Sequence, residues 1–370
     1  MKVVYITPTY FSDRSLIGGA ERYASTLASL MAEHVDTTLV SFGPHRQSYQ
    51  EDNLNIEIFP VKAPIHGNMM NAIHIGYISS LLNATIIHIH HIYTLVSDVS
   101  CLIGHFLGKR VFVTDHGGGG SLVISHKLPV FRCYTNLVAQ SEYTLGSIND
   151  KLSQKAVTIK GGVDTNWFYP TSTVKKEKKI LFVGRVIPHK GINYLIEGFK
   201  LLAVSDYKLT IVGRIKGDIS QKFYRYLRKI AEGLPVEFIQ DADDRRLLQE
   251  YRSAIVTVLP SVHTTCYGDY TAVPELMGFT LLESQASGTP VICTDAGAMH
   301  EFVNHGKTGL VVEQNSGQAI AKALQHLIQL SSQDYQEYQK HSIKWIANNF
   351  SWSIVVKKHL ELYQGIANSL

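Results

Sequence analysis

The chain has 370 residues, of which 45% are hydrophobic and 18% are charged. This length predicts about two domains, and the composition excludes a disordered protein. A chain of this length can bury hydrophobic cores that need no disulfide or metal to stabilise them. The four cysteines, Cys101, Cys133, Cys266 and Cys293, show no CxxC spacing. That pattern argues against a zinc ribbon and fits a reducing cytosol.

The formal net charge is +4, from 35 Lys and Arg against 31 Asp and Glu. Residues 1–164 hold 12 basic and 12 acidic residues, so the excess lies wholly in the second half. This excess is too small for a dedicated nucleic-acid binder but suits an anionic small ligand in the second half. No stretch is typical of a signal peptide or a membrane span. We therefore expect a cytoplasmic protein, with peripheral contact to a membrane surface left open.

Short runs of β-branched residues alternate with helical periodicity along the first half. The expected strands are 3–7, 37–42, 55–61, 84–90, 110–116 and 137–141. The expected helices are 20–34, 70–83, 94–107 and 143–152. Strands that alternate with helices predict a parallel sheet with helices on both faces.

The alternation stops at a polar stretch, 170–179, which we interpret as a linker or surface connection. It then resumes, with strands expected at 178–185, 207–214, 236–240, 254–261, 289–295 and 308–313. The expected helices are 191–202, 220–232, 244–253, 279–287, 316–329, 333–349 and 352–367. The predicted fold class is α/β, with two doubly wound, Rossmann-like domains whose strand ends can face a central cleft.

Paired glycines, Gly18 and Gly19, directly precede the first expected helix. Such glycines let backbone N–H groups approach a ligand oxygen at a helix N-terminus, although a tight turn alone would also explain them. The pattern is not GxGxxG, and no acidic residue for a ribose follows the second strand. A dehydrogenase is therefore not favoured.

Histidines follow two of the expected strands. His90 and His91 fall at the carboxyl end of a strand, where ligands collect in such sheets. No carboxylate or cysteine is near them in sequence, so cleft-lining histidines are favoured over metal ligands. His116 begins an HGGG run that resembles the oxyanion loop of some esterases, but the chain has no GxSxG elbow. We therefore set that hydrolase aside and expect His116 to contact a substrate.

The second half carries the stronger signal. Arg185 and Lys190 lie at a strand end just before a helix, where two cations can clamp a diphosphate. Glu275 and Glu283 follow, with Gly278 between them. Glu283 falls on a helix and can bind a ribose diol. Glu275 falls on the preceding loop and can hold a sugar hydroxyl or stabilise positive charge at an anomeric carbon.

Taken in order, these motifs resemble the retaining glycosyltransferases of family 4, which have the GT-B fold. The matching elements span about residues 1–315 and are Gly18-Gly19-Ala20-Glu21-Arg22, the HxHH strand end, Gly161-Gly162-Val163-Asp164 before Phe168-Tyr169-Pro170, Gly184-Arg185 with Lys190-Gly191, Pro260-Ser261, and Glu275 and Glu283 followed by GTPVI. The resemblance implies an acceptor-binding domain in 1–162 and a donor-binding domain in 163–351. It also implies that a helix in 352–370 packs back on the first domain.

The resemblance also implies roles for individual residues. The donor diphosphate would contact Arg185, Lys190, Gly19, Gly278, Phe279 and Thr280, the ribose Glu283, and the base Gly213, Ile239 and Gln240. Glu275 and His116 would act at the reaction centre, and His90, His91, Tyr267 and Tyr270 would line the acceptor and the transferred sugar. No metal and no other cofactor is implied. The partners would be a nucleotide-sugar donor and a glycan or lipid-linked glycan acceptor, with no nucleic acid.

The chain departs from the family pattern at two places. Met277 and Phe279 flank Gly278, where the family usually has Phe and an aliphatic residue. Thirteen residues, 262–274, separate Pro260-Ser261 from Glu275, where the common pattern has only a few. We hypothesise that this insertion selects or covers the donor sugar; a loop without a role in specificity is the alternative. Its polar and aromatic candidates are His263, Tyr267, Asp269 and Tyr270.

Asp241-Ala242-Asp243 matches DxD, the metal–diphosphate motif of the other common glycosyltransferase fold, but a solvated acidic turn is favoured here. The predicted function is transfer of a hexose, with UDP-glucose as the first donor to test. The transfer would be metal-independent, proceed with retention and serve polysaccharide or glycolipid biosynthesis. Two alternatives stay open. One is a nucleotide-sugar epimerase or hydrolase on the same fold, and the other is a non-catalytic scaffold protein that binds sugar nucleotides.

Overall fold

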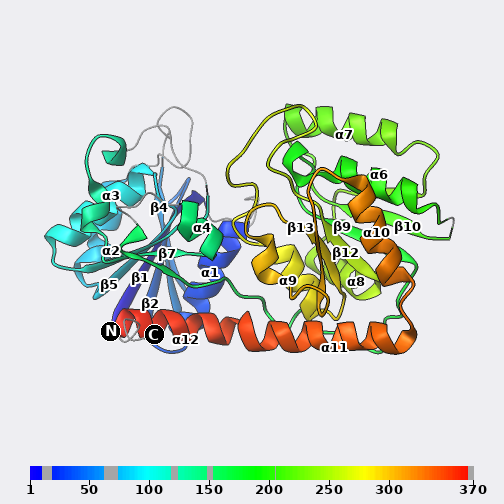
Figure 1. Cartoon of the computed structure of the whole chain (residues 1–370). Coiled ribbons are helices and arrows are strands. Elements are labelled where there is room, and N and C mark those ends of the chain that lie inside the picture. The colour runs from blue at the N-terminus through cyan, green and yellow to red at the C-terminus, as the bar shows by residue number, and fades with distance from the viewer. Residues whose placement is uncertain (11–18, 62–73, 118–123, 148–152, 205, 366–370) are drawn as a thin grey trace. The chain divides into compact units, whose positions relative to one another are not determined.

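The computed structural model describes residues 1–10, 19–61, 74–117, 124–147, 153–204 and 206–365. The chain forms two compact units (Figure 1), Met1–Gly161 with Val355–Leu370, and Gly162–Ile354. It therefore passes from the first unit to the second and returns at its end. The predicted boundary after 162 and the predicted return at 352 lie next to these two crossing points.

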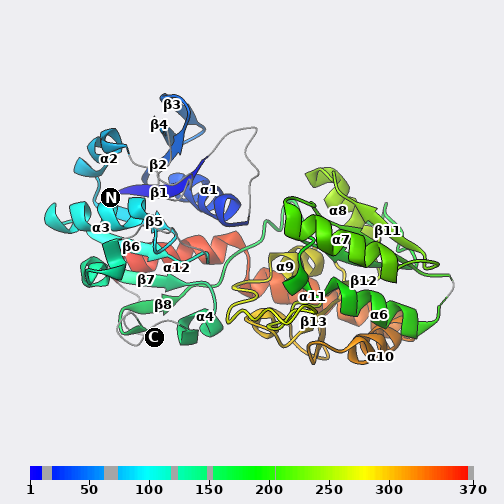
Figure 2. The same ribbon diagram turned by 90° about the horizontal axis from the view of Figure 1, so that it is seen from above.

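The first unit is built on an eight-stranded sheet in the order β3-β4-β2-β1-β5-β6-β7-β8 (Figure 2), parallel except for β3. Its strands are β1 (Lys2–Tyr10), β2 (Asp36–Gly43), β3 (Gln47–Glu51), β4 (Leu54–Pro60), β5 (Ile86–His90), β6 (Arg110–Thr114), β7 (Asn136–Ala139) and β8 (Ala156–Thr158). Its helices are α1 (Gly19–Ala32), α2 (Ile78–Leu82), α3 (Leu95–Phe106), α4 (Glu142–Ser147) and α12 (Trp352–Gln364), with short 3-10 turns at Ile75–Tyr77, Ile124–His126 and Val130–Cys133.

The middle of this sheet is covered on both faces. Val3 to Ile6 of β1 and Ile86 to Ile89 of β5 are fully buried, which explains why both strands are rich in apolar residues on both faces. Helix α12 packs on the sheet through Tyr363, whose hydroxyl lies 2.9 Å from the hydroxyl of Tyr5 and also bonds His88 Nδ1. The last helix of the chain thus completes the core of the first unit.

The second unit is built on a six-stranded parallel sheet in the order β11-β10-β9-β12-β13-β14. Its strands are β9 (Lys179–Val183), β10 (Lys208–Val212), β11 (Val236–Ile239), β12 (Val256–Leu259), β13 (Val291–Thr294) and β14 (Gly309–Val312). Its helices are α6 (Ile192–Leu202), α7 (Asp218–Ile230), α8 (Asp244–Ser253), α9 (Phe279–Ala286), α10 (Gly317–Ile328) and α11 (Ser332–Asn349), with 3-10 turns at Pro188–Lys190 and Met299–Phe302.

The helix predicted at 70–83 is much shorter in the structure, and residues 62–73 lie outside the described residues. His74 has extended backbone angles, and its imidazole Nδ1 accepts the N–H of Gly76. This side-chain cap starts the helical turn after His74, so the helix does not extend back through it. The end of the helix predicted at 143–152 also lies outside the described residues.

Polar residues also bear on two other stretches, 47–51 and 170–179. Strand β3 was not expected because all five of its residues are exposed, so it lacks an apolar face. The stretch 170–179 was interpreted as a linker or surface connection, and 170–178 forms no helix or strand. Lys179, which begins β9, is buried in an ion pair with Glu250, 2.7 Å apart. Lys176 donates to the carbonyl of Ala254 at 2.9 Å. Partners distant in sequence thus hold this charged stretch against the second unit.

Candidate functional site

Two of the predicted donor-site residues meet in the second unit. Lys190, at the end of the turn after β9, forms an ion pair with Glu275, whose Oε1 also accepts the hydroxyl of Ser261 at 2.8 Å. The side chains of Lys190 and Glu275 are 14% and 9% exposed. Removal of either side chain of this ion pair would be strongly destabilising, because it would leave the other charge buried without a partner. Ser261 belongs to the Pro260-Ser261 motif, whose role could not be predicted from the sequence.

Charges converge on His189, the residue before Lys190. Its pKa is lowered by burial and by the positive charges of Arg185 and Lys190, while Asp269 and Glu275 act in the opposite direction. Arg185 is exposed to solvent. The structure thus brings the predicted residues Arg185, Lys190 and Glu275 within electrostatic range of His189. It also places Asp269 of the insertion close enough to act on this group.

The backbone around Lys190 is shaped by a glycine that no other residue could replace. Gly191 has a φ of 62°, and a Cβ there would lie 1.9 Å from the carbonyl oxygen of Pro260. The turn after β9 therefore sits directly on the loop after β12. This close approach is what brings Lys190 next to Ser261 and Glu275.

Helix α9 starts at the predicted phosphate-binding loop. Gly278 is its N-cap residue, and no side chain caps the helix there. The Thr280 hydroxyl donates to the carbonyl of Val183 in β9 at 3.2 Å, which ties the first turn of α9 to the strand that precedes Arg185. Phe279 and Thr280 thus lie where a helix N-terminus can receive an anion.

Glu283 lies one turn further along α9, as predicted. Its Oε2 accepts a 2.7 Å hydrogen bond from the hydroxyl of Tyr251, a fully buried residue of α8. The ring of Tyr251 packs edge-on against Phe168. Tyr251 lies outside the motifs found in the sequence, so this contact could not be predicted from the sequence.

The candidate base-binding residues lie at neighbouring strand ends. The N–H of Gly213 donates to the carbonyl of Ile239 at 2.9 Å, and Gln240 after it is exposed. A Cβ at Gly213 would lie 1.8 Å from the carbonyl oxygen of Gly184. Backbone packing therefore requires this glycine, whatever it contacts in a ligand.

The insertion 262–274 folds into a small hairpin, with an antiparallel bridge between Thr264 and Tyr270. His263 Nδ1 lies 2.9 Å from the carbonyl oxygen of Thr271, and its Nε2 accepts the N–H of Gly297 at 3.3 Å. Tyr270 stacks on His263 and is 71% exposed. Tyr267 of the same hairpin contacts Phe223 and Tyr226 of α7.

Four histidines gather in the first unit at the carboxyl ends of β5 and β6. His90 Nδ1 lies 2.8 Å from His116 Nε2, and His91 packs against His116 with ring centroids 5.1 Å apart. His88 stacks on His90 at 5.0 Å. The structure thus joins the three predicted histidines His90, His91 and His116 in one cluster, held from α1 by an edge-on contact of Tyr23 with His116.

These histidines are neutral at pH 7. Burial, reinforced by neighbouring histidines, lowers the pKa values of His90 and His116 well below the ordinary value of 6.5. Burial lowers the pKa of His91 to about 4. Both ring nitrogens of His91 are buried without a hydrogen-bond partner among the described residues. A neutral imidazole can accept a hydroxyl proton or donate its own, which suits contact with a sugar.

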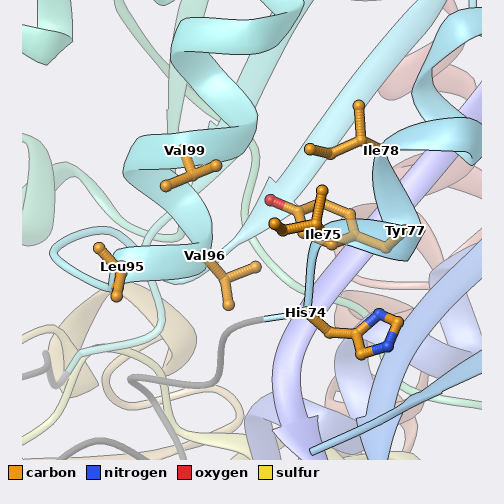
Figure 3. A pocket seen from close by; sticks show the side chains of 7 residues that line it. All are labelled: His74, Ile75, Tyr77, Ile78, Leu95, Val96 and Val99. Atoms are coloured by element: carbon orange, nitrogen blue, oxygen red, sulfur yellow. The ribbon is translucent and has the colours of Figure 1, made fainter.

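Gly19 is the first residue of α1, with Glu21 in the first turn, whereas Gly18 lies outside the described residues. A separate pocket of about 40 Å³ opens between the 3-10 turn Ile75–Tyr77 and α3 (Figure 3). Its lining is apolar apart from His74 and Tyr77, and the Tyr77 hydroxyl is already bonded to Ser100 at 2.9 Å. This pocket therefore offers little to the hydroxyls of a sugar.

Asp243 of the DxD sequence caps α8, because its carboxylate accepts the N–H of Arg246 at 2.7 Å. Over the residues that the structure describes, no group of three or more His, Cys, Asp or Glu is arranged to hold a metal ion. Within the same residues, no helix is both long and apolar enough to cross a membrane.

Two models of known protein families together match residues 17–345 of the chain. The family model for glycosyl transferases group 1 matches residues 164–345, and that for glycosyltransferase family 4 matches residues 17–167. The chain belongs to the family 4 type of glycosyltransferases. The predicted family is thereby confirmed, and the two Rossmann-like units confirm the predicted GT-B fold class.

Individual relatives are distant. The chain is 30% identical over 190 residues to an uncharacterised glycosyltransferase of Methanocaldococcus jannaschii, a match that covers 51% of this chain and 45% of the relative. It is 28% identical over 229 residues to the phosphatidyl-myo-inositol mannosyltransferase of Mycobacterium leprae, covering 60% and 56%. These matches span about half the length of each relative. The crystal structure of Anabaena HepE in complex with UDP-glucose superposes with a TM-score of 0.72 at 15% identity, over 99% of this chain and all of that one, which shows the fold.

Proposed function

We propose that this glycosyltransferase transfers a hexose from a nucleoside-diphosphate sugar to a hydroxyl of a glycan or lipid-linked glycan. The observation that carries the proposal is the group formed by Lys190, Glu275 and Ser261 beside the N-terminus of α9. A cation, an uncapped helix start and two carboxylates are the groups that a sugar diphosphate requires. The donor would bind the second unit, and the acceptor would bind near the histidine cluster of the first.

Each residue would act on a different part of the donor. Arg185 and Lys190 would neutralise the diphosphate as it leaves, and the N-terminus of α9 would add to this stabilisation. Glu283, oriented by Tyr251, would accept hydrogen bonds from the ribose. Glu275 would hold a hydroxyl of the transferred sugar. This assignment needs no metal ion, which we propose on the strength of the two cations.

The transfer would proceed with retention at the anomeric carbon. Oε1 of Glu275 already accepts from Lys190 and Ser261, so this carboxylate is better placed to stabilise positive charge than to take a proton from the acceptor. A leaving phosphate oxygen, on the same face as the incoming hydroxyl, would then take that proton. His116, neutral at pH 7, would contact the sugar rather than act as an acid.

The choice of donor, acceptor and compartment is also a proposal. UDP-glucose is the first donor to test because HepE, which shares the fold, was crystallised in complex with it. A lipid-linked acceptor is in line with the name of the mycobacterial relative, and would place the protein in polysaccharide or glycolipid biosynthesis. The four cysteines are free, which supports a reducing compartment such as the cytoplasm.

The test measures nucleotide release from UDP-, GDP-, ADP- and dTDP-sugars in the presence of EDTA, without an acceptor and then with candidate acceptors. We expect slow release from one donor, faster release with an acceptor, and a glycoside product that keeps the donor's anomeric configuration. Glu275→Gln should lower turnover more than donor affinity, while Glu337→Gln on the exposed face of α11 should change neither.

Other outcomes would support the alternatives. Consumption of donor without a glycoside from any acceptor would indicate an epimerase or hydrolase. Nucleotide binding without turnover, unaffected by Glu275→Gln, would indicate a scaffold protein. Activity that is lost in EDTA and restored by a divalent cation would refute the metal-independent assignment.

A further inference from the structure

Helix α7 and the residues that flank it concentrate the positive charge of the chain. Residues 214–232 hold six basic and two acidic residues, a net charge of +4 that equals the net charge of the whole chain. The basic residues are all exposed: Arg214, Lys216, Lys222, Arg225, Arg228 and Lys229. None of them forms an ion pair within the described part of the chain. A positive excess equal to that of the whole chain therefore lies on α7 and the residues that flank it.

The spacing along α7 aligns these charges. Phe223 and Leu227 are fully buried and Ser220 nearly so, which fixes the face that packs on the unit. Lys222, Arg225 and Lys229 follow the i, i+3, i+7 spacing of a single helical row on the opposite face. Figure 1 shows α7 along the outer edge of the second unit, beyond α6.

A row of exposed apolar and aromatic side chains lies beside these cations. Ile219 is 70% exposed, Tyr226 37% and Tyr267 43%. Tyr267 comes from the insertion hairpin, and its ring lies 6.3 Å from that of Tyr226 and 5.1 Å from Lys222 Nζ. Ile219 precedes Tyr226 by seven residues, so the two lie on the same face of α7, two helical turns apart. Exposed apolar and aromatic side chains that gather on one face beside cations are typical of an interaction surface. Tyrosines whose ring is apolar and whose hydroxyl is polar are typical of a membrane–water interface.

We propose that this surface, defined by Lys222, Arg225, Lys229, Ile219, Tyr226 and Tyr267, docks on a membrane rich in anionic lipids. The cations would contact lipid phosphates, and Ile219 with the two tyrosines would enter the headgroup layer. Attraction to an anionic leaflet acts within about a Debye length, so only cations on one face contribute together. Cations alone would serve nucleic acid equally well. The exposed Ile219 beside them favours a lipid surface, because a phosphodiester backbone offers nothing for its side chain.

The test is co-sedimentation of the full chain with vesicles of phosphatidylcholine, with and without 30% phosphatidylglycerol. We expect binding to the anionic vesicles only, and its loss in high salt. The triple variant Lys222→Gln, Arg225→Gln, Lys229→Gln should weaken partitioning about a hundredfold, since each basic residue near the surface contributes roughly fivefold. Its matched control, Lys340→Gln, Lys357→Gln, Lys358→Gln, removes the same charge from α11 and α12 and should weaken binding less than about threefold.

A second variant separates lipid from nucleic acid. Ile219→Ser should weaken binding to anionic vesicles several-fold while leaving any binding to single-stranded RNA unchanged. The proposal is overturned if the wild type does not sediment with anionic vesicles, if both triple variants lose binding equally, or if α7 binds RNA and not vesicles. The readout is binding rather than turnover, so the result does not depend on the proposed enzymatic function.

Discussion

The hydrogen bond between Tyr251 and Glu283 allows a quantitative prediction about the affinity for nucleotides. Tyr251→Phe removes one hydroxyl from a fully buried ring and leaves its packing against Phe168 in place. The lost interaction is a 2.7 Å hydrogen bond to a carboxylate. If Glu283 binds a ribose diol, this change should loosen the orientation of the carboxylate that the diol needs.

The expected magnitude follows from the kind of bond. A hydrogen bond to a charged group contributes about 1.5–3 kcal/mol. Glu283 is partly exposed, so we take the lower end, which corresponds to about a tenfold weaker affinity for a nucleoside diphosphate. A 2′-deoxynucleoside diphosphate lacks one of the hydroxyls, so its affinity should fall much less. The ratio of the two affinities should therefore decrease about tenfold.

Isothermal titration calorimetry with UDP and 2′-deoxy-UDP measures this ratio directly, or the corresponding pair if another base is preferred. Tyr335→Phe is the matched control, because its partly buried hydroxyl donates to the carbonyl of Ile255 at 2.7 Å in the same unit. An equal loss of affinity for both nucleotides would indicate general damage to the unit. An unchanged ratio would refute the role of Tyr251 in orienting Glu283.

Three further predictions concern the charges of the two units. Lys190→Met should weaken nucleotide affinity at least tenfold, measured by calorimetry. It should also lower the melting temperature, because a buried carboxylate without its partner costs about 3 kcal/mol. An unchanged nucleotide affinity or an unchanged melting temperature would contradict the corresponding expectation. Glu275→Gln keeps the shape of that side chain but removes its charge, so kcat should fall at least a hundredfold with a small change in donor Kd, and equal changes in both would limit Glu275 to binding. Burial lowers the pKa values of His91 and His359 to about 4. The unfolded state therefore binds more protons below pH 6.5, and stability should be lost between pH 6.5 and 4, by up to about 3 kcal/mol per histidine; urea midpoints that stay flat over this range would contradict the reasoning.

The sequence predicted the sheets well because their strands are buried on both faces. Runs rich in β-branched and apolar residues, such as 3–7 and 84–90, can be accommodated in few other ways in an α/β chain. It failed where a polar residue has a partner distant in sequence. Burial and the charge of Lys179 lower the pKa of Lys176 to about 7. The local sequence pattern around Lys176 does not distinguish this buried lysine from an exposed one.

Some residues of the candidate site could be predicted from the sequence and others could not. Lys190, Glu275 and Glu283 lie in motifs whose spacing reflects a turn and a helix start, so their placement could be predicted. Tyr251 and His189 could not, because each acts through a fold contact rather than a motif. The insertion shows both limits. Its presence was clear from its length, but its tie to Gly297 and to α7 depends on packing.

The two crossings of the chain affect how the molecule is made. Tyr5 and Tyr363 are hydrogen-bonded at a separation of 358 residues. The first unit therefore cannot complete its core until nearly the whole chain has left the ribosome, although its sheet is synthesised first. The second unit, continuous from 162 to 354, can fold earlier. Truncation within α12 should consequently damage the unit farthest from it in sequence, and an isolated first unit should fold only when α12 is supplied in trans or by circular permutation.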